Sequence, residues 1–169
     1  MSALKDISTI EKPPRIATLA CDGRGYPIFF TAFVGSDGKP NFRIQDPYKW
    51  QVATERSLCG ICGQKLGKRF AFVGGPKSMK SRYFTDAPMH ESCAIYALQA
   101  CPFIAMPRMA YLKHVQPGHE LNHLVSDTKP ELFGIGIATK MKLVHFQGQQ
   151  LIKAGAWLRV RFWKDGSPV

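Results

Sequence analysis

Two short motifs carry residue types that bind metal ions. Cys59 and Cys62 form a Cys-x2-Cys pair with a glycine after each cysteine, and after 27 intervening residues His90 and Cys93 form a His-x2-Cys pair. The first spacing lets two thiolates converge on one ion, and the glycines let the turn close. Three cysteines and one histidine are a standard closed tetrahedral donor set for zinc. We therefore predict that these four residues bind one Zn²⁺.

The elements around these motifs must bring the two pairs together. Pro88 can occupy the first position of a helix, which places His90 and Cys93 in its first turn, on one face. Residues 70–73 and 82–85 flank a Gly-Gly-Pro turn and predict a β-hairpin between the pairs. A knuckle, a hairpin and a ligand-bearing helix follow one another in a treble clef. Because four protein ligands fill the zinc coordination, we predict a structural site.

A second motif raises the alternative of a zinc-dependent hydrolase. His119, Glu120 and His123 match H-E-x-x-H, in which two histidines bind zinc and the glutamate acts as general base. A Pro-Gly pair directly precedes the motif, and a proline follows within about two turns, so a rigid helix is not expected there. A nuclease of the HNH type would need a histidine on the hairpin, and residues 63–89 contain none. Peptidase and nuclease activity are therefore the weaker alternatives.

Positive charge is the other marked property of the chain. Lysine and arginine number 23 against 12 acidic residues, which gives a net charge of +11. Segments 65–82 and 132–164 each contain six bases and no acid. Such a charge distribution favours polyanionic partners. The predicted contacts to nucleic acid or another acidic partner are Lys65, Lys68, Arg69, Lys77, Lys80, Arg82, Tyr83, Arg159 and Arg161.

Composition and patterning predict an α+β fold of antiparallel strands around the zinc-binding knuckle, hairpin and helix. The chain has 169 residues, 45% of them hydrophobic, with 15 glycines and 12 prolines, which indicates one globular domain with many turns. Residues 1–14 are expected to be a flexible lead and 15–169 the domain, with the zinc segment 58–102 inserted between N-terminal and C-terminal strands. Asp46 and Pro47 predict a helix start. Strands are predicted at 15–21, 26–34, 40–45, 132–139, 141–146, 151–153 and 156–163.

The expected compartment is the cytoplasm. No window approaches 18 consecutive apolar residues, and the N-terminal residues lack the pattern of a signal peptide. In a reducing compartment the five cysteines are expected to be metal ligands or free thiols. Cys21 and Cys101 are predicted to be small buried apolar groups.

The chain resembles a family of uncharacterised small proteins of bacteriophages and bacteria, actinobacteria included. The resemblance rests on the Cys59–Cys62 knuckle, on the Phe-Val-Gly-Gly-Pro segment at 72–76, on residues 88–93 and on Cys-Pro-Phe at 101–103. It covers most of residues 15–166 and does not include the H-E-x-x-H motif. The resemblance implies a phage setting, in which the compartment would be the host cytoplasm, and implies no particular chemistry.

These observations favour a small basic protein that zinc stabilises and that binds nucleic acid or a nucleoprotein. The alternative is a protein-interaction factor, for example an inhibitor of a host defence machine, that uses the same basic surface. The sequence does not distinguish between these two classes, because both need exposed positive charge.

Overall fold

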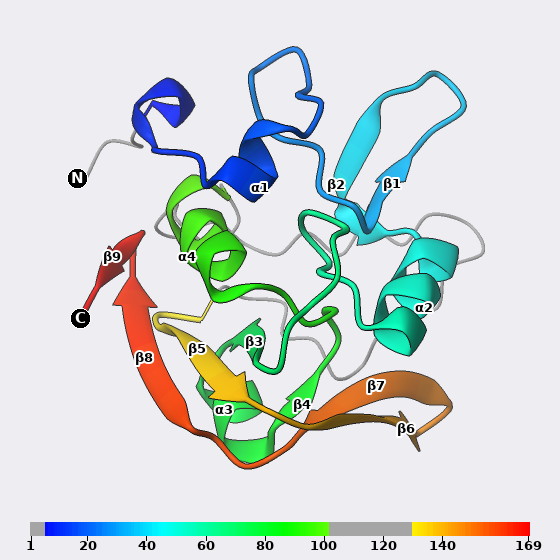
Figure 1. Ribbon diagram of the computed structural model, residues 1–169, viewed down its shortest axis with the longest axis vertical. Coiled ribbons are helices and arrows are strands. Elements are labelled where there is room, and N and C mark those ends of the chain that lie inside the picture. Colours follow the sequence, from blue (N-terminus) through cyan, green and yellow to red (C-terminus); the bar gives the residue numbers. More distant parts are fainter. Residues whose placement is uncertain (1–5, 102–129) are drawn as a thin grey trace.

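The computed structural model describes residues 6–101 and 130–169, which form an α+β fold with antiparallel sheets (Figure 1). The described strands form three sheets, with the orders β1-β2, β3-β5-β8-β9 and β4-β7-β6. In chain order the elements are η1 (Ile7–Thr9), α1 (Pro14–Ala17), β1 (Ala32–Val34), β2 (Pro40–Gln45), α2 (Pro47–Arg56), β3 (Phe70–Gly74), α3 (Pro76–Ser81), β4 (Tyr83–Phe84), α4 (Glu91–Ala100), β5 (Phe133–Ala138), β6 (Met141–Phe146), β7 (Gln149–Ala154), β8 (Arg159–Lys164) and β9 (Ser167–Pro168).

The N-terminal region differs from the predicted hairpin of residues 15–21 and 26–34. Pro14 begins the short helix α1, because a proline at the first helical position has a preset φ and needs no N–H partner. Pairing between the two segments is limited to one bridge, Cys21 to Pro27, and Pro27 has no N–H to extend a ladder. Within the expected flexible lead, Ile10 is 6% exposed and packs into the core.

Strand β2 and helix α2 confirm the predicted strand at 40–45 and the predicted helix start at Asp46 and Pro47. Strand β2 covers Pro40–Gln45 and pairs with β1 across a turn. Helix α2 begins after Asp46, whose carboxylate accepts hydrogen bonds from Tyr48 N–H and Lys49 N–H at 3.0 and 3.1 Å. Trp50 of α2 is buried, and its Nε1–H donates to the Thr85 carbonyl at 2.8 Å. This bond ties α2 to the segment that leads to α4.

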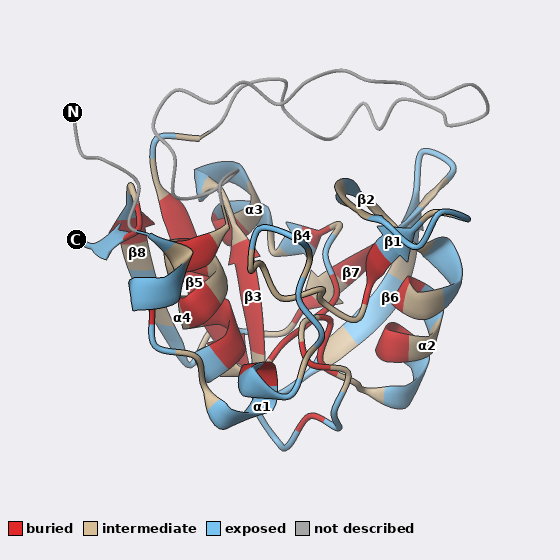
Figure 2. Ribbon diagram, turned by 90° about the horizontal axis from the view of Figure 1, so that it is seen from above, coloured by how far each residue is buried: buried red, intermediate tan, exposed pale blue. Residues whose placement is uncertain are grey.

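The sheet β3-β5-β8-β9 separates two hydrophobic cores. Val73 and Ile135 face the first core, which contains α4, whereas Phe72 faces the second core with Met79 of α3. The second face is lined by alternate glycines of β5: a Cβ on Gly134 would lie 2.7 Å from Met79, and one on Gly136 2.5 Å from the Trp157 ring. These glycines allow α3 and Trp157 to pack directly on the strand. Figure 2 shows β3 and β5 as buried strands inside the molecule.

The prediction of a β-hairpin between the two ligand pairs is wrong. Strand β3 pairs with β5, and the returning strand β4 pairs with β7, so they belong to different sheets. The Gly-Gly-Pro segment begins helix α3, with Pro76 at its first position, and the helix ends at Arg82 with φ 64°. A treble clef is therefore not confirmed.

Four of the five C-terminal strands were predicted correctly apart from their ends, and β9 was not predicted. Strands β5, β6, β7 and β8 cover the four predicted segments, with β7 longer than expected and β8 starting later. Strand β5 pairs with β3 and β8 on its two sides, and all six of its residues are buried. Strand β6 lies at the edge of its sheet and has no buried residue. Strands β4, β6 and β7 and helix α3 lie together at the lower edge of the molecule (Figure 1).

Candidate metal centre

Cys59, Cys62, His90 and Cys93 lie together between the segment after α2 and the start of α4. One potential ligand atom from each residue can be chosen so that all four lie within 4.8 Å of one another. Cys59 and Cys93 are fully buried, Cys62 is 8% exposed, and His90 is half-buried at the edge of the cluster. The structure thus brings together all four predicted ligands as a cluster that could hold a metal ion.

The knuckle is closed by its own backbone. Cys59 N–H donates to the Gln64 carbonyl at 2.8 Å, and Gly63 N–H donates to the Cys59 carbonyl at 2.9 Å. Gly63 has φ 72°, a left-handed conformation that glycine adopts without the steric cost of a Cβ. A further bridge pairs Leu58 with Lys65. The two cysteines therefore sit in a turn whose shape does not depend on their side chains alone.

The start of α4 is attached to the knuckle and to β3 by backbone hydrogen bonds. Gly60 N–H donates to the Pro88 carbonyl at 2.9 Å, and Met89 exchanges two 2.9 Å bonds with Ala71 of β3. His90 follows as the N-cap of α4, and its side chain makes no capping bond. The imidazole is thus directed to the cluster while the backbone on both sides of it is held.

One contact selects the tautomer of His90. Its Nε2 lies 3.1 Å from the carbonyl oxygen of Lys65, and its Nδ1 lies 3.3 Å from Cys62 Sγ. Because a carbonyl only accepts hydrogen bonds, Nε2 carries the hydrogen and Nδ1 keeps its lone pair. An outer carbonyl that orients a ligating histidine in this way is usual at metal sites. Nδ1 is therefore the nitrogen of His90 that could coordinate a metal ion.

The three sulfurs differ in their electrostatics. A hydrogen bond from the Cys93 thiol lowers the pKa of Cys59 to about 5 against the desolvation that raises it, and the N–H groups of Cys62 and His90 add to the lowering. These two N–H groups lie 3.5 and 3.4 Å from Cys59 Sγ. The same hydrogen bond, followed by desolvation, raises the pKa of Cys93, and desolvation followed by the Cys59 charge raises that of Cys62. A bound cation would let all three ionise.

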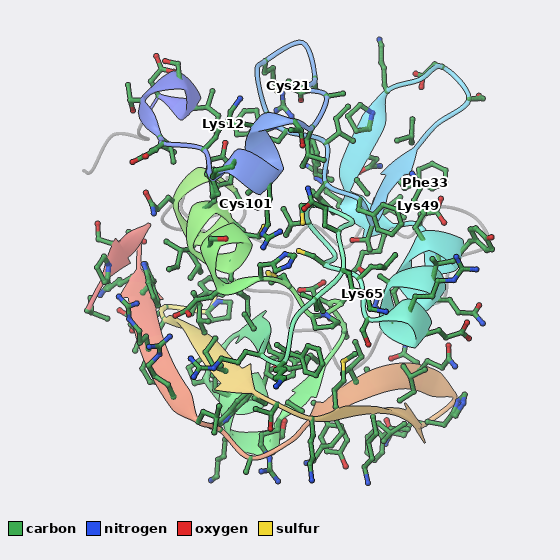
Figure 3. All side chains as sticks on the ribbon, in the orientation of Figure 1. Lys12, Cys21, Phe33, Lys49, Lys65 and Cys101 are labelled. Carbon is green, nitrogen blue, oxygen red and sulfur yellow. The ribbon has the colours of Figure 1, made fainter. Side chains whose placement is uncertain are left out.

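The predicted basic residues of segment 65–82 lie on several elements. Lys65 lies beside the knuckle (Figure 3), next to Leu66 of the first core, and Lys68 and Arg69 follow it along the chain. Lys77 and Lys80 are exposed on α3, whose Met79 packs into the second core on the other face of the central sheet. The acid-free segment 65–82 therefore has basic residues both beside the knuckle and on α3.

The two arginines of β8 have neighbours of their own. Arg159 Nη2 forms an ion pair with Glu91 at the start of α4. The Arg161 guanidinium lies 4.8 Å from the centre of the Trp163 ring. Arg159 therefore helps to connect β8 with α4, which carries Cys93 of the cluster, and its charge is partly balanced.

Tyr83 is 39% exposed, whereas its neighbour Phe84 is 3% exposed and belongs to the second core. Two residues that the sequence analysis did not single out lie close to Tyr83. Phe146 is 47% exposed, and the Nζ atom of Lys153 lies 3.9 Å from the Tyr83 ring centre. The available signal was the prediction of strands at 141–146 and 151–153. It could not be used without knowing the strand partner.

The remaining predictions concern the H-E-x-x-H motif and the two cysteines outside the cluster. The H-E-x-x-H motif at 119–123 lies outside the described residues. Cys21 is exposed and Cys101 is half-buried, so the prediction that both are buried is wrong. Figure 3 shows Cys21 in the loop after α1 and Cys101 where α4 ends.

Comparison of the chain with protein-family models, with curated proteins and with solved structures finds no match. Among the described residues, no helix has the length and apolar character needed to cross a membrane. The cluster that could hold a metal ion and the exposed basic residues are the features from which a function can be proposed.

Proposed function

We propose that this chain is a zinc-stabilised protein that binds nucleic acid through its positively charged surface. Thiolate and imidazole donors in a four-coordinate set are typical of structural zinc. The zinc would join the knuckle to α4 as in a treble clef, with β3, α3 and β4 in the place of the hairpin. Since all four positions are filled by protein, the ion would stabilise the fold without offering a site to substrate.

The observation that carries the nucleic-acid proposal is the shortage of acidic partners for the basic residues. Segments 65–82 and 132–164 contain twelve lysines and arginines in all. Among the described carboxylates, Glu91 pairs with Arg159 and Glu131 with Lys164. The other ten bases have no ion pair in the described part of the chain, so they are available to the phosphates of a polyanion.

The biological setting is a separate proposal. The resemblance of the knuckle and the residues around it to small bacteriophage and bacterial proteins supports a role in phage biology, in the cytoplasm of the host. Nucleic acid would be abundant there, and an inhibitor of a host machine could use the same basic surface.

Salt dependence of binding tests the proposed function. Fluorescence anisotropy with a labelled oligonucleotide should give a logarithm of affinity that falls linearly with the logarithm of salt concentration, because each phosphate contact releases counterions. The Lys77→Ala/Lys80→Ala variant should lower the slope by about one unit for each phosphate that it no longer neutralises. Absence of binding to single and double strands at low salt would refute the proposal, and capture of one host protein that resists nuclease treatment would favour a protein partner.

Metal analysis tests the zinc. Purified protein should contain about one equivalent of zinc, as expected for a closed four-ligand site. A different metal, or none after purification without chelators, would contradict the assignment without affecting the nucleic-acid measurement.

A further inference from the structure

The sheet β4-β7-β6 presents one face to solvent, and its register shows which residues lie there. Tyr83 pairs with Lys153, and Lys153 pairs with Lys142, so these three residues form a row across the strands. Paired residues in an antiparallel sheet point to the same side. The neighbouring row contains Phe84 and Ile152, which are buried in the second core. The row of Tyr83 therefore points outward.

Two aromatic rings stand near each other on this outward face. Phe146 is four residues from Lys142 on the same strand and shares its side. The rings of Tyr83 and Phe146 have centroids 6.3 Å apart and planes inclined by 25°. Between their rows lies Leu151, which is 3% exposed although it belongs to neither core. The two rings and Leu151 therefore lie on the same side of the sheet.

The charge around the rings is positive and unbalanced. The Lys153 ammonium lies 3.9 Å from the Tyr83 ring centre and donates a hydrogen bond to the Ser81 carbonyl. Lys142 stands directly opposite Lys153, and like charges in that position destabilise a sheet. Neither lysine forms an ion pair within the described part of the chain, and residues 132–164 contain no acid. Figure 3 shows nitrogen-tipped side chains that project outward beside β6 and β7.

We propose that the outward face of β4-β7-β6 is a stacking platform for single-stranded nucleic acid, an inference that rests on the nucleic-acid binding proposed above. Tyr83 and Phe146 stack on unpaired bases, and Lys142 and Lys153 contact the phosphates that connect them. Exposed rings beside lysines suit a single strand, because its bases offer free faces whereas those of a duplex are covered by their neighbours. The face therefore favours single strands over duplexes of the same length.

A second aromatic surface is the rival site within the described residues. A groove of about 580 Å³ between the β1–β2 hairpin and α4 is lined by several rings, among them Phe33, which is 37% exposed. The groove is lined by Arg24, Lys39 and Arg43 and also by Asp37, and Arg24 is paired with Asp22 at 3.0 Å. These carboxylates reduce the attraction for phosphate, whereas residues 132–164 of the sheet face contain none. The observations therefore favour the sheet.

The test compares single-stranded and duplex binding by the same variants. We would measure the affinity of the full chain for an oligothymidylate of about 12 nucleotides, a length within known single-strand site sizes, and for a duplex of equal length. Tyr83→Ala and Phe146→Ala should each weaken oligothymidylate binding by about 5- to 150-fold, the range expected for loss of one stacked base. Duplex affinity should change less than about two-fold, because the lysines that bind phosphate remain.

Two matched controls accompany these variants. Tyr83→Phe should retain the affinity, since stacking needs the ring and not the hydroxyl. Tyr48→Ala removes a ring that is 75% exposed on α2, outside the platform, and should also leave binding unchanged. Unchanged metal content and melting temperature would show that Tyr83→Ala and Phe146→Ala are folded. Phe146 lies on an edge strand, so its variant remains informative if Tyr83→Ala fails to fold.

Each result supports or overturns the platform. Selective loss of oligothymidylate binding by both alanine variants supports it. Unchanged affinity in folded variants, equal loss for single strand and duplex, or loss in Phe33→Ala instead, overturns the platform and leaves nucleic-acid binding intact. Absence of binding to either oligonucleotide by the unaltered chain at low salt overturns the proposed function, and the platform with it.

Discussion

The metal cluster and the outward face of β4-β7-β6 use polar residues in opposite ways. In the cluster, the sulfurs are buried, His90 is hydrogen-bonded on its far side, and backbone bonds connect the surrounding segments. On the sheet face, two large aromatic residues are 39% and 47% exposed and two lysines oppose each other without a carboxylate. The cluster is suited to stabilising the fold. On the sheet face, the two opposed lysines repel each other, and a negatively charged partner would reduce that repulsion. Substitutions should therefore separate stability from binding.

The largest effect is expected from loss of a metal ligand. Cys59→Ser or Cys93→Ser should give protein without zinc and without a cooperative unfolding transition, because structural zinc contributes apparent binding free energies of about 10–16 kcal/mol in zinc-finger peptides. That contribution is as large as the whole stability of an ordinary domain, about 5–15 kcal/mol. Metal analysis and thermal denaturation measure both effects. Cys21→Ser is the control, since Cys21 is exposed and outside the cluster. Full zinc and unchanged melting in Cys59→Ser would show that the cluster is not the site.

A second prediction tests whether the packing of the second core against the sheet β3-β5-β8-β9 can be weakened without losing the metal. Gly136→Ala places a Cβ 2.5 Å from the Trp157 ring, so the ring must move. Overpacking of this kind costs about 1–3 kcal/mol of unfolding free energy. Denaturant titration should show that loss, and the zinc content should stay at about one equivalent, the stoichiometry of a closed four-ligand site. Gly67→Ala, where the new Cβ meets nothing within 4 Å, should be neutral. Zinc loss in Gly136→Ala would mean that the two faces are not separable.

The same comparison explains which features were predictable from the sequence. The four residues of the cluster were found because each pair is local: Cys59 and Cys62 share a turn, and His90 and Cys93 share the start of a helix. The capped start of α2 at Asp46 is local for the same reason. In each case the spacing and the chemistry depend on a few neighbouring residues, so the sequence alone was enough to identify them.

The errors concern strand partners that are distant in the chain. Phe70–Gly74 is an apolar run that suits any sheet, and its partner β5 is about 60 residues further on, too far for local signals to identify. Gly75-Pro76 suits a turn or a helix start equally well, and the structure uses it for α3. Which of Tyr83 and Phe84 points outward depends on the register with β7, because a shift of one residue exchanges the faces.

A third and smaller effect is expected at the contact between β8 and α4. Glu91 is adjacent to the ligand His90, and its partner Arg159 is 48% exposed at the side chain. Because exposed ion pairs contribute about 0–1 kcal/mol, Glu91→Gln should lower the unfolding free energy by about 0.5 kcal/mol and leave zinc bound. Chemical denaturation at low and high salt measures the loss, which should shrink as salt screens the pair. A fall in zinc content would instead give Glu91 a role at the metal.

The smallest expected effect on stability has the opposite sign and bears on the purpose of the sheet face. Lys142→Gln removes one of two opposed ammonium groups, so the unfolding free energy should rise by about 0.2–0.5 kcal/mol at low salt. The gain should disappear near 1 M salt, where the Debye length is about 3 Å. Affinity for oligothymidylate should fall in the same variant, because one fewer ammonium group neutralises phosphate. Lys39→Gln makes the same change of charge at an exposed residue of the rival groove, outside both acid-free segments, and should do neither. If the Lys142→Gln protein is more stable and binds oligothymidylate as tightly as before, the opposed lysines do not serve to bind a polyanion. If it is more stable and binds more weakly, the two lysines lower the stability of the fold and increase its affinity for a polyanion.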